Sequence, residues 1–182
     1  MPNYATNRQW SDQFLPEVKR LVGAHLLEAA PADQDMREAT DLMMLDARDR
    51  RVAVRVRRPG FAERFPNDFT LRAKIPSGGQ TELSKIVNGK GDWMFYAHAA
   101  NDTGMLSAWY LIDLRAFRAA LIRASQHPLR YGEQYNADGS SFVWFDIRSF
   151  PNQPPLVVAS SAGSTQAPVN INAAPKQLSS SY

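Results

Sequence analysis

The feature that most restricts the fold of this chain is a strictly alternating segment, VAVRVR, at residues 52–57. Side chains of a β-strand point alternately to the two faces of a sheet. The three valines therefore share one face, and Ala53, Arg55 and Arg57 share the other. The segment predicts a strand in a sheet with one apolar side and one side that carries arginines.

Helical and strand patterns alternate along the rest of the chain. Phe14, Leu15, Val18, Leu21 and Val22 recur at helical spacing and predict an amphipathic helix. Helices are expected over 14–24, 81–87 and 114–124, with Asp113 as the cap of the last. Strands are expected over 41–45, 52–57, 69–73, 92–97, 108–112 and 141–147. The order predicts a mixed α/β fold, with a central mixed sheet flanked by helices and a hairpin joining 41–45 to 52–57.

The composition changes after Phe150. Residues 151–182 contain no acidic residue and one basic residue, Lys176, among many Pro, Ser and Ala. Such a segment buries too little apolar surface to offset its ordering entropy. We therefore expect a single domain over 1–150 and a disordered tail over 151–182, with 156–159 as an alternative edge strand.

Several classes of protein are disfavoured. The chain has no cysteine, which removes disulfides and thiolate metal sites and fits a reducing cytoplasm. It has no run of 18 apolar residues and no apolar segment at its start, so neither a membrane span nor a signal peptide is expected. His25, His98 and His127 lack metal-ligand spacing, and no GxSxG or P-loop motif is present.

Basic residues are concentrated between Arg48 and Lys74, a segment that contains nine arginines and lysines and three acidic residues. Sixteen of the 21 basic residues of the chain are arginine, whose planar fork suits phosphate and carboxylate. This segment indicates either a surface for an anionic partner or a strand edge protected by charge. Asp41, at the start of an apolar strand, needs a partner: either Arg55 or Arg57 across the strands, or a divalent metal.

The elements follow the order helix, strands, helix, strand, and two of the strands carry the runs ATDLMML (39–45) and VAVRVRR (52–58). In this order and these runs, the chain resembles the restriction-endonuclease-like PD-(D/E)XK phosphodiesterase superfamily. It covers about residues 14–113. A group of phage-encoded proteins is similar in these runs and in FTLR, TELSKI and GDWMFY.

The resemblance implies a magnesium site. In the superfamily, the aspartate of the first motif and the acid of the (D/E)xK motif bind Mg²⁺, and the lysine positions water. Asp41 matches the first motif. In the second motif the acid falls on Ala53 or Arg55 and the lysine on Arg55 or Arg57, so this chain departs from the pattern.

In some members of the superfamily these groups lie on the following helix instead. Glu82 and Lys85 are three residues apart on that expected helix and share a face. Glu17, on the first helix, is another candidate acid, and a plain surface ion pair is the alternative for Glu82 and Lys85. The resemblance thus implies Asp41, Glu82 and Lys85 as catalytic residues, with Mg²⁺ on Asp41 and Glu82.

The expected function is that of a nuclease-like, magnesium-dependent phosphodiester hydrolase in the cytoplasm, of the host if phage-encoded, that acts on DNA or RNA. The basic segment supplies the candidate nucleic-acid contacts: Arg55, Arg57, Arg58, Arg72 and Lys74. The alternatives are a non-catalytic nucleic-acid-binding module and a protein-interaction domain on the same fold. The oligomeric state is left open, with a homodimer as one alternative.

Overall fold

The computed structural model of the chain describes residues 4–29, 42–44 and 50–162. Its helices are α1 (Tyr4–Asp12), α2 (Leu15–His25), α4 (Glu82–Val87), α5 (Leu114–Ile122) and the 3-10 turn η1 (Ile147–Ser149). Its strands are β1 (Leu27–Ala29), β2 (Leu42–Met44), β3 (Val52–Arg57), β4 (Asp68–Lys74), β5 (Trp93–Ala99), β6 (Leu106–Asp113), β7 (Tyr131–Tyr135), β8 (Ser141–Asp146) and β9 (Val157–Ser160). The protein is mixed α/β, as the sequence predicted.

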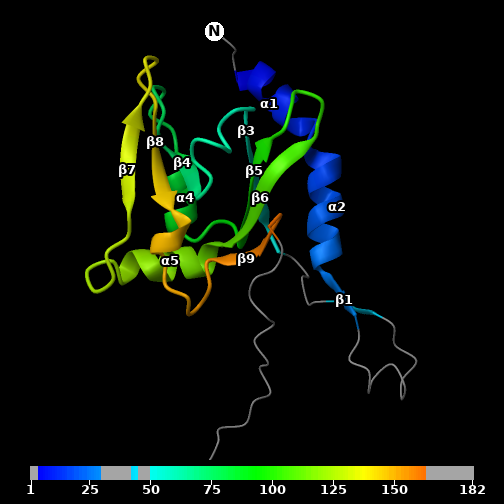
Figure 1. Cartoon of the computed structure of the whole chain (residues 1–182). Helices are drawn as coiled ribbons and strands as arrows, with labels where there is room; N and C mark the ends of the chain where they lie inside the picture. Colours follow the sequence, from blue (N-terminus) through cyan, green and yellow to red (C-terminus); the bar gives the residue numbers. More distant parts are fainter. Residues whose placement is uncertain (1–3, 30–41, 45–49, 163–182) are drawn as a thin grey trace, which may run out of the picture.

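The strands form a mixed four-stranded sheet, a three-stranded antiparallel sheet and a two-stranded ribbon. The mixed sheet has the order β3-β5-β6-β9, with β3 parallel to β5 and the other neighbours antiparallel. The second sheet has the order β4-β8-β7, and β1 pairs with β2. In Figure 1, α2 lies on one side of the mixed sheet, the β4-β8-β7 sheet on the other, and α5 beneath both sheets.

Two apolar clusters hold these layers together. One lies between α2 and the mixed sheet and contains Phe14, Val18, Phe95 and Leu111, with Val52 and Val56 packed against it. The other lies between the two sheets, α4 and α5, and is centred on Phe69, whose ring contacts four other aromatic rings. The alternation in β3 is visible in its contacts, since Val52 and Val56 pack in the cluster on the α2 side, whereas Arg55 contacts Glu82 of α4 and Arg57 contacts Thr70 of β4.

The helix boundaries follow from local chemistry. The Thr81 hydroxyl accepts a hydrogen bond from the Ser84 amide and caps α4, which ends before Gly89 at a φ of 81°. The Asp113 carboxylate accepts from the amides of Arg115 and Ala116, so it caps α5 as expected. Both helix starts were readable because each cap acts within its own turn.

The hairpin predicted between 41–45 and 52–57 is wrong for the described residues. β2 pairs with β1, whereas β3 pairs in parallel with β5 through Val52↔Trp93 to Arg57↔His98. The prediction of a single sheet flanked by helices also needs correction, because one face of the mixed sheet packs against a second sheet. Periodicity identifies strands but does not choose their partners.

Two further elements were not predicted. Helix α1 (YATNRQWSD) and edge strand β7 (YGEQY) are largely polar and carry no apolar periodicity. β7 is held by its pairing with β8, from Tyr131↔Phe145 to Tyr135↔Ser141. An edge strand of this kind gains its stability from backbone hydrogen bonds more than from burial, so its sequence gives little signal.

The predicted domain end at residue 150 is also wrong, because the fold continues to at least residue 162. β9 pairs with β6, and Leu156 and Ala159 are 4% and 7% exposed. The Asp113 amide also donates to the Leu156 carbonyl, at 2.8 Å. The edge strand considered for 156–159 is therefore present, at Val157–Ser160. Residues 163–182 lie outside the described residues.

Two truncations test whether the segment that contains β9 stabilises the fold. Deleting 151–182 should lower the free energy of unfolding by about 3 kcal/mol, because burial of Leu156 and the pairing with β6 are both lost. For a domain of this size, that corresponds to a melting point roughly 6–12 °C lower. Deleting 163–182 alone is the matched control, and we expect it to leave the midpoint within about 2 °C. Equal midpoints for the two truncations in thermal unfolding would contradict the packing role of β9.

No helix in the described part of the chain has both the length and the apolar character needed to cross a membrane.

Candidate functional site

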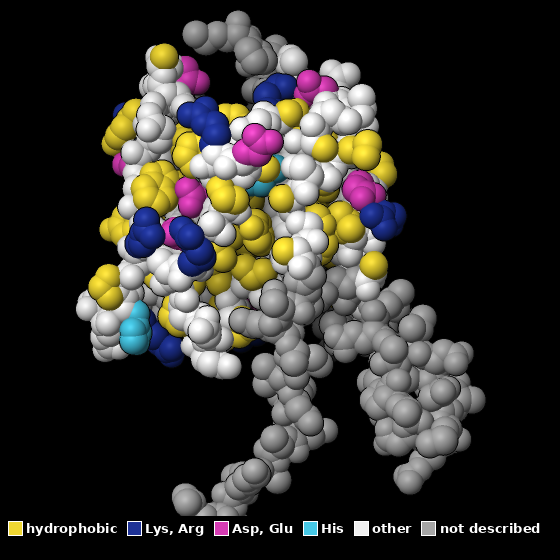
Figure 2. All heavy atoms as spheres, in the orientation of Figure 1, with side chains coloured by type: hydrophobic (Ala, Val, Ile, Leu, Met, Phe, Trp, Pro, Cys, Tyr) yellow, Lys and Arg dark blue, Asp and Glu magenta, His cyan; other side chains and the backbone are white. Residues whose placement is uncertain are grey.

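A cleft of about 620 Å³ opens between the mixed sheet and the β4-β8-β7 sheet. Side chains from β3, β4, β5, β7 and β8 line it, together with the loop that follows β3 and the η1 turn. Its lining residues are Arg57, Phe61, Arg64, Phe65, Pro66, Asn67, Asp68, Thr70, Tyr96, His98, Arg130, Gln134, Phe142, Trp144, Asp146 and Arg148. Figure 2 shows basic and acidic side chains close together on this side of the molecule, with hydrophobic side chains between them.

Arg57 is held firmly at the mixed-sheet wall of the cleft. Its Nη1 donates a hydrogen bond to the Thr70 hydroxyl, at 2.9 Å. The guanidinium carbon lies 4.3 Å from the centre of the Phe61 ring and 5.5 Å from that of Phe142. Contacts with two aromatic rings fix the plane of a guanidinium without neutralising its charge. Arg57 therefore presents an oriented positive charge to the cleft.

His98 is the neighbour of Arg57 on β5, and it is 1% exposed. Neither Nδ1 nor Nε2 has a hydrogen-bond partner among the described residues. Burial, reinforced by the charge of Arg57, lowers the pKa of His98 to about 4. The imidazole is thus neutral at pH 7, with one donor and one acceptor that no described residue satisfies.

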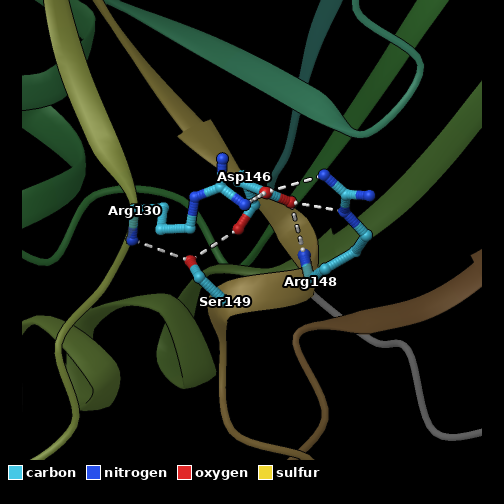
Figure 3. A network of polar contacts seen from close by, with 4 residues as sticks. All are labelled: Arg130, Asp146, Arg148 and Ser149. Carbon is cyan, nitrogen blue, oxygen red and sulfur yellow. Dashed lines mark hydrogen bonds and ion pairs between the residues drawn. The ribbon is translucent and has the colours of Figure 1, made fainter.

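Asp146 joins two arginines at the opposite wall (Figure 3). Its carboxylate, in a residue that is 2% exposed, accepts from the backbone amide, Nε and Nη2 of Arg148, each at 3.0 Å. Arg130 Nη1 lies 3.2 Å from the same carboxylate, and Ser149 bridges the backbones of Arg130 and Asp146. The hydrogen bonds from Arg148 hold the pKa of Asp146 below its ordinary value. Asp146 is therefore ionised, and it orients both guanidinium groups.

The charge of the cleft is positive on balance. Four arginines and two carboxylates line it, and His98 is neutral, so the net charge is +2. The second carboxylate, Asp68, is paired in register with Asp146 across β4 and β8. Burial, together with the negative charge of Asp146, raises the pKa of Asp68. A cleft of this charge favours an anionic ligand.

The predicted catalytic residue Glu82 forms an ion pair with a predicted nucleic-acid contact. Glu82 Oε2 lies 2.7 Å from Arg55 Nη1 and also accepts from the Arg72 amide, at 3.1 Å. The two side chains are 25% and 21% exposed. Asp41 was expected to pair with Arg55 or Arg57, but it lies outside the described residues; among the described residues Arg55 pairs with Glu82.

The other predicted residues are spread more widely. Asp41 lies outside the described residues, and Lys85 is exposed on α4. Arg58 packs over the Trp10 ring, with 4.5 Å between the guanidinium carbon and the ring centre, while Arg72 and Lys74 are exposed on β4. Glu17, the further candidate acid, pairs with Arg20 at 2.7 Å. Of the predicted set, Arg57 alone lines the cleft in the described part of the chain.

The described residues contain no group of three or more His, Cys, Asp or Glu that could hold a metal ion. Glu82 is the one described member of the implied magnesium pair, and Arg55 already supplies the positive charge beside it. Asp41, the other member, lies outside the described residues, so the described residues alone do not complete the implied pair.

Sequence reasoning missed most of the cleft. His98 was considered only as a metal ligand, and Asp146, Arg130 and Arg148 were not considered at all. One signal was available, namely a histidine inside the apolar run WMFYAHA of β5. A polar ring in a buried strand needs a hydrogen-bond partner, and the immediately neighbouring residues in the sequence offer no polar side chain for it.

Comparison of the chain with models of protein families, with curated proteins and with solved structures finds no match.

Proposed function

We propose that this domain binds nucleic acid at the cleft between its two sheets, on a restriction-endonuclease-like core. The observation that carries the proposal is the net positive cleft, in which Arg57 is fixed between two rings and Arg130 and Arg148 are oriented by Asp146. Oriented arginines on a concave surface are suited to successive phosphates of a nucleic-acid backbone.

The strand arrangement supports the core proposed here. Parallel strands need a crossover connection, and the one between β3 and β5 contains α4. A helix before the sheet and a parallel strand after α4 agree with the order of elements on which the resemblance rests, whereas β2, from the ATDLMML run, pairs with β1 outside the mixed sheet.

Salt dependence tests the binding. Affinity for duplex DNA should fall with rising salt, with a logarithmic slope of about −0.9 for each phosphate contact. Arg57→Gln should weaken binding and make the slope shallower by about one contact. Arg20→Gln is the matched control, because Arg20 pairs with Glu17 on α2, away from the cleft. Unchanged affinity and slope in Arg57→Gln, with the fold intact, would contradict the proposal.

Phosphodiester hydrolysis is the second candidate function. The observation that favours it is the position of Glu82, which reaches from α4 to Arg55 on β3, where the resemblance places the second motif. In this candidate, Asp41 and Glu82 would hold a divalent cation, and Lys85 would orient the attacking water.

A cleavage assay tests this second candidate. DNA and RNA would be incubated with Mg²⁺ or Mn²⁺, with EDTA as the control. Metal-dependent cleavage that is abolished by Asp41→Asn or Glu82→Gln and slowed by Lys85→Met supports hydrolysis. Such residues act as one unit, so their effects should be non-additive. Nucleic-acid binding without cleavage would leave the first function and remove the second.

A further inference from the structure

The cleft has two properties that backbone binding alone does not explain. It is lined by several aromatic rings, and it contains a buried imidazole with both nitrogens unpartnered among the described residues. Phosphate contacts need neither feature. Aromatic rings are typical of sites that take up a base as well as its phosphate, and a buried imidazole with no protein partner is satisfied only when another polar group approaches it.

We propose that the cleft takes one unpaired nucleotide of a nucleic-acid strand, with its phosphate beside Arg57 and His98 and its base against Phe142 and Trp144. This inference rests on the proposed function and narrows its substrate class to nucleic acid with an unpaired end or an unpaired base.

The polar end of the site is preorganised. Arg57 and His98 stand side by side on β3 and β5, and Thr70 anchors the Arg57 guanidinium. The neutral imidazole can donate to a phosphate oxygen through one nitrogen and accept from a sugar or base through the other. A buried polar group gains most when a ligand supplies its missing partner.

The aromatic end depends on a glycine. Gly132 on β7 is paired with Trp144 on β8, and a β-carbon at position 132 would come within 2.8 Å of the indole. Real β-carbons do not approach other atoms so closely, so any side chain there would displace the ring. The absence of a side chain at Gly132 thus places the Trp144 indole in the cleft lining.

The size of the cleft favours one nucleotide over a stacked duplex. Ligand pockets typically occupy about 300–1,000 Å³, and this cleft has about 620 Å³. A base within a duplex has both faces covered by its neighbours, whereas an unpaired base can stack on an aromatic side chain.

Fluorescence polarisation on the full chain tests the inference with four probes. These are a labelled 12-nucleotide single strand, a blunt hairpin duplex, the same hairpin with a short unpaired tail, and free AMP as competitor. We expect the single strand and the tailed hairpin to bind about tenfold more tightly than the blunt hairpin. AMP should compete only weakly, because it lacks the neighbouring phosphates.

Two variants test whether the tighter binding of unpaired nucleotides depends on the cleft. Trp144→Leu should remove about tenfold of the affinity for the single strand and leave the blunt hairpin unchanged. Gly132→Ala, which displaces the indole without removing it, should act in the same direction. Tyr135→Leu is the matched control, since Tyr135 is an exposed aromatic residue of β7 outside the cleft lining.

The outcomes separate the two proposals. If no nucleic acid binds, the proposed function fails. If all three nucleic acids bind equally and neither Trp144→Leu nor Gly132→Ala alters binding, nucleic-acid binding stands and the unpaired-nucleotide site is overturned. AMP that binds as tightly as the single strand would assign the cleft to a free nucleotide and likewise overturn the strand inference.

Discussion

Lowering the pH from 7 to 4 should cost the protein about 3 kcal/mol of its free energy of unfolding through His98 alone. The pKa of His98 is lowered from 6.5 to about 4 in the folded protein, so the unfolded chain binds the proton more tightly. The stabilisation is therefore fully present above about pH 6.5, and it is lost as the pH falls towards 4. Each unit of pKa difference corresponds to about 1.4 kcal/mol.

Urea unfolding of the parent and of His98→Gln, measured between pH 7 and pH 4, checks this result. Glutamine does not titrate. Between pH 7 and pH 4, the free energy of unfolding of the parent should therefore fall by about 3 kcal/mol relative to that of His98→Gln. Asp146 and Asp68 also titrate with shifted pKa values, but they are present in both proteins and cancel in the difference. Parallel stability curves for the two proteins would contradict a buried, neutral His98.

Removing one partner of the Arg55–Glu82 ion pair is the second change with a large expected effect. Glu82→Ala should lower the free energy of unfolding by about 2 kcal/mol, between the values typical of exposed and of buried pairs. Arg55 would lose its carboxylate, while its Nε is already buried with no hydrogen-bond partner among the described residues. The Arg72 amide would lose its acceptor as well.

The double variant Arg55→Met/Glu82→Met should recover most of this loss, because an apolar pair of similar volume leaves no charge unpartnered. Thermal or urea unfolding of Arg55→Met, Glu82→Met and the double variant, each compared with the parent, gives the coupling energy. A magnesium titration of the melting point tests whether Glu82 binds a metal. A melting point that Mg²⁺ raises in the parent, but not in Glu82→Gln, would favour the second candidate function over a structural ion pair.

Arg57 shows how much of the candidate site could be predicted from the local sequence pattern. The alternation in VAVRVR placed this residue on the face opposite the valines, and Val52 and Val56 do pack towards α2. The basic segment also identified Arg57 as a phosphate contact, which stays a prediction. The pattern could not show that Phe61 and Phe142 would enclose it, since Phe142 lies 85 positions further along the chain.

The sequence by itself determined the elements whose signals act within a few residues. The amphipathic spacing of α2, the Asp113 cap of α5 and the alternation in β3 each operate over one or two turns or along one strand. Only the tertiary structure decided that β3 pairs with β5, that a second sheet packs on the first, and that β9 completes the sheet edge. The cleft belongs to this second group, because Arg57, His98 and Asp146 come from three strands that meet only after the sheets have formed. Strand pairing depends on which apolar faces can be buried together, and that is a property of the whole chain rather than of any one segment.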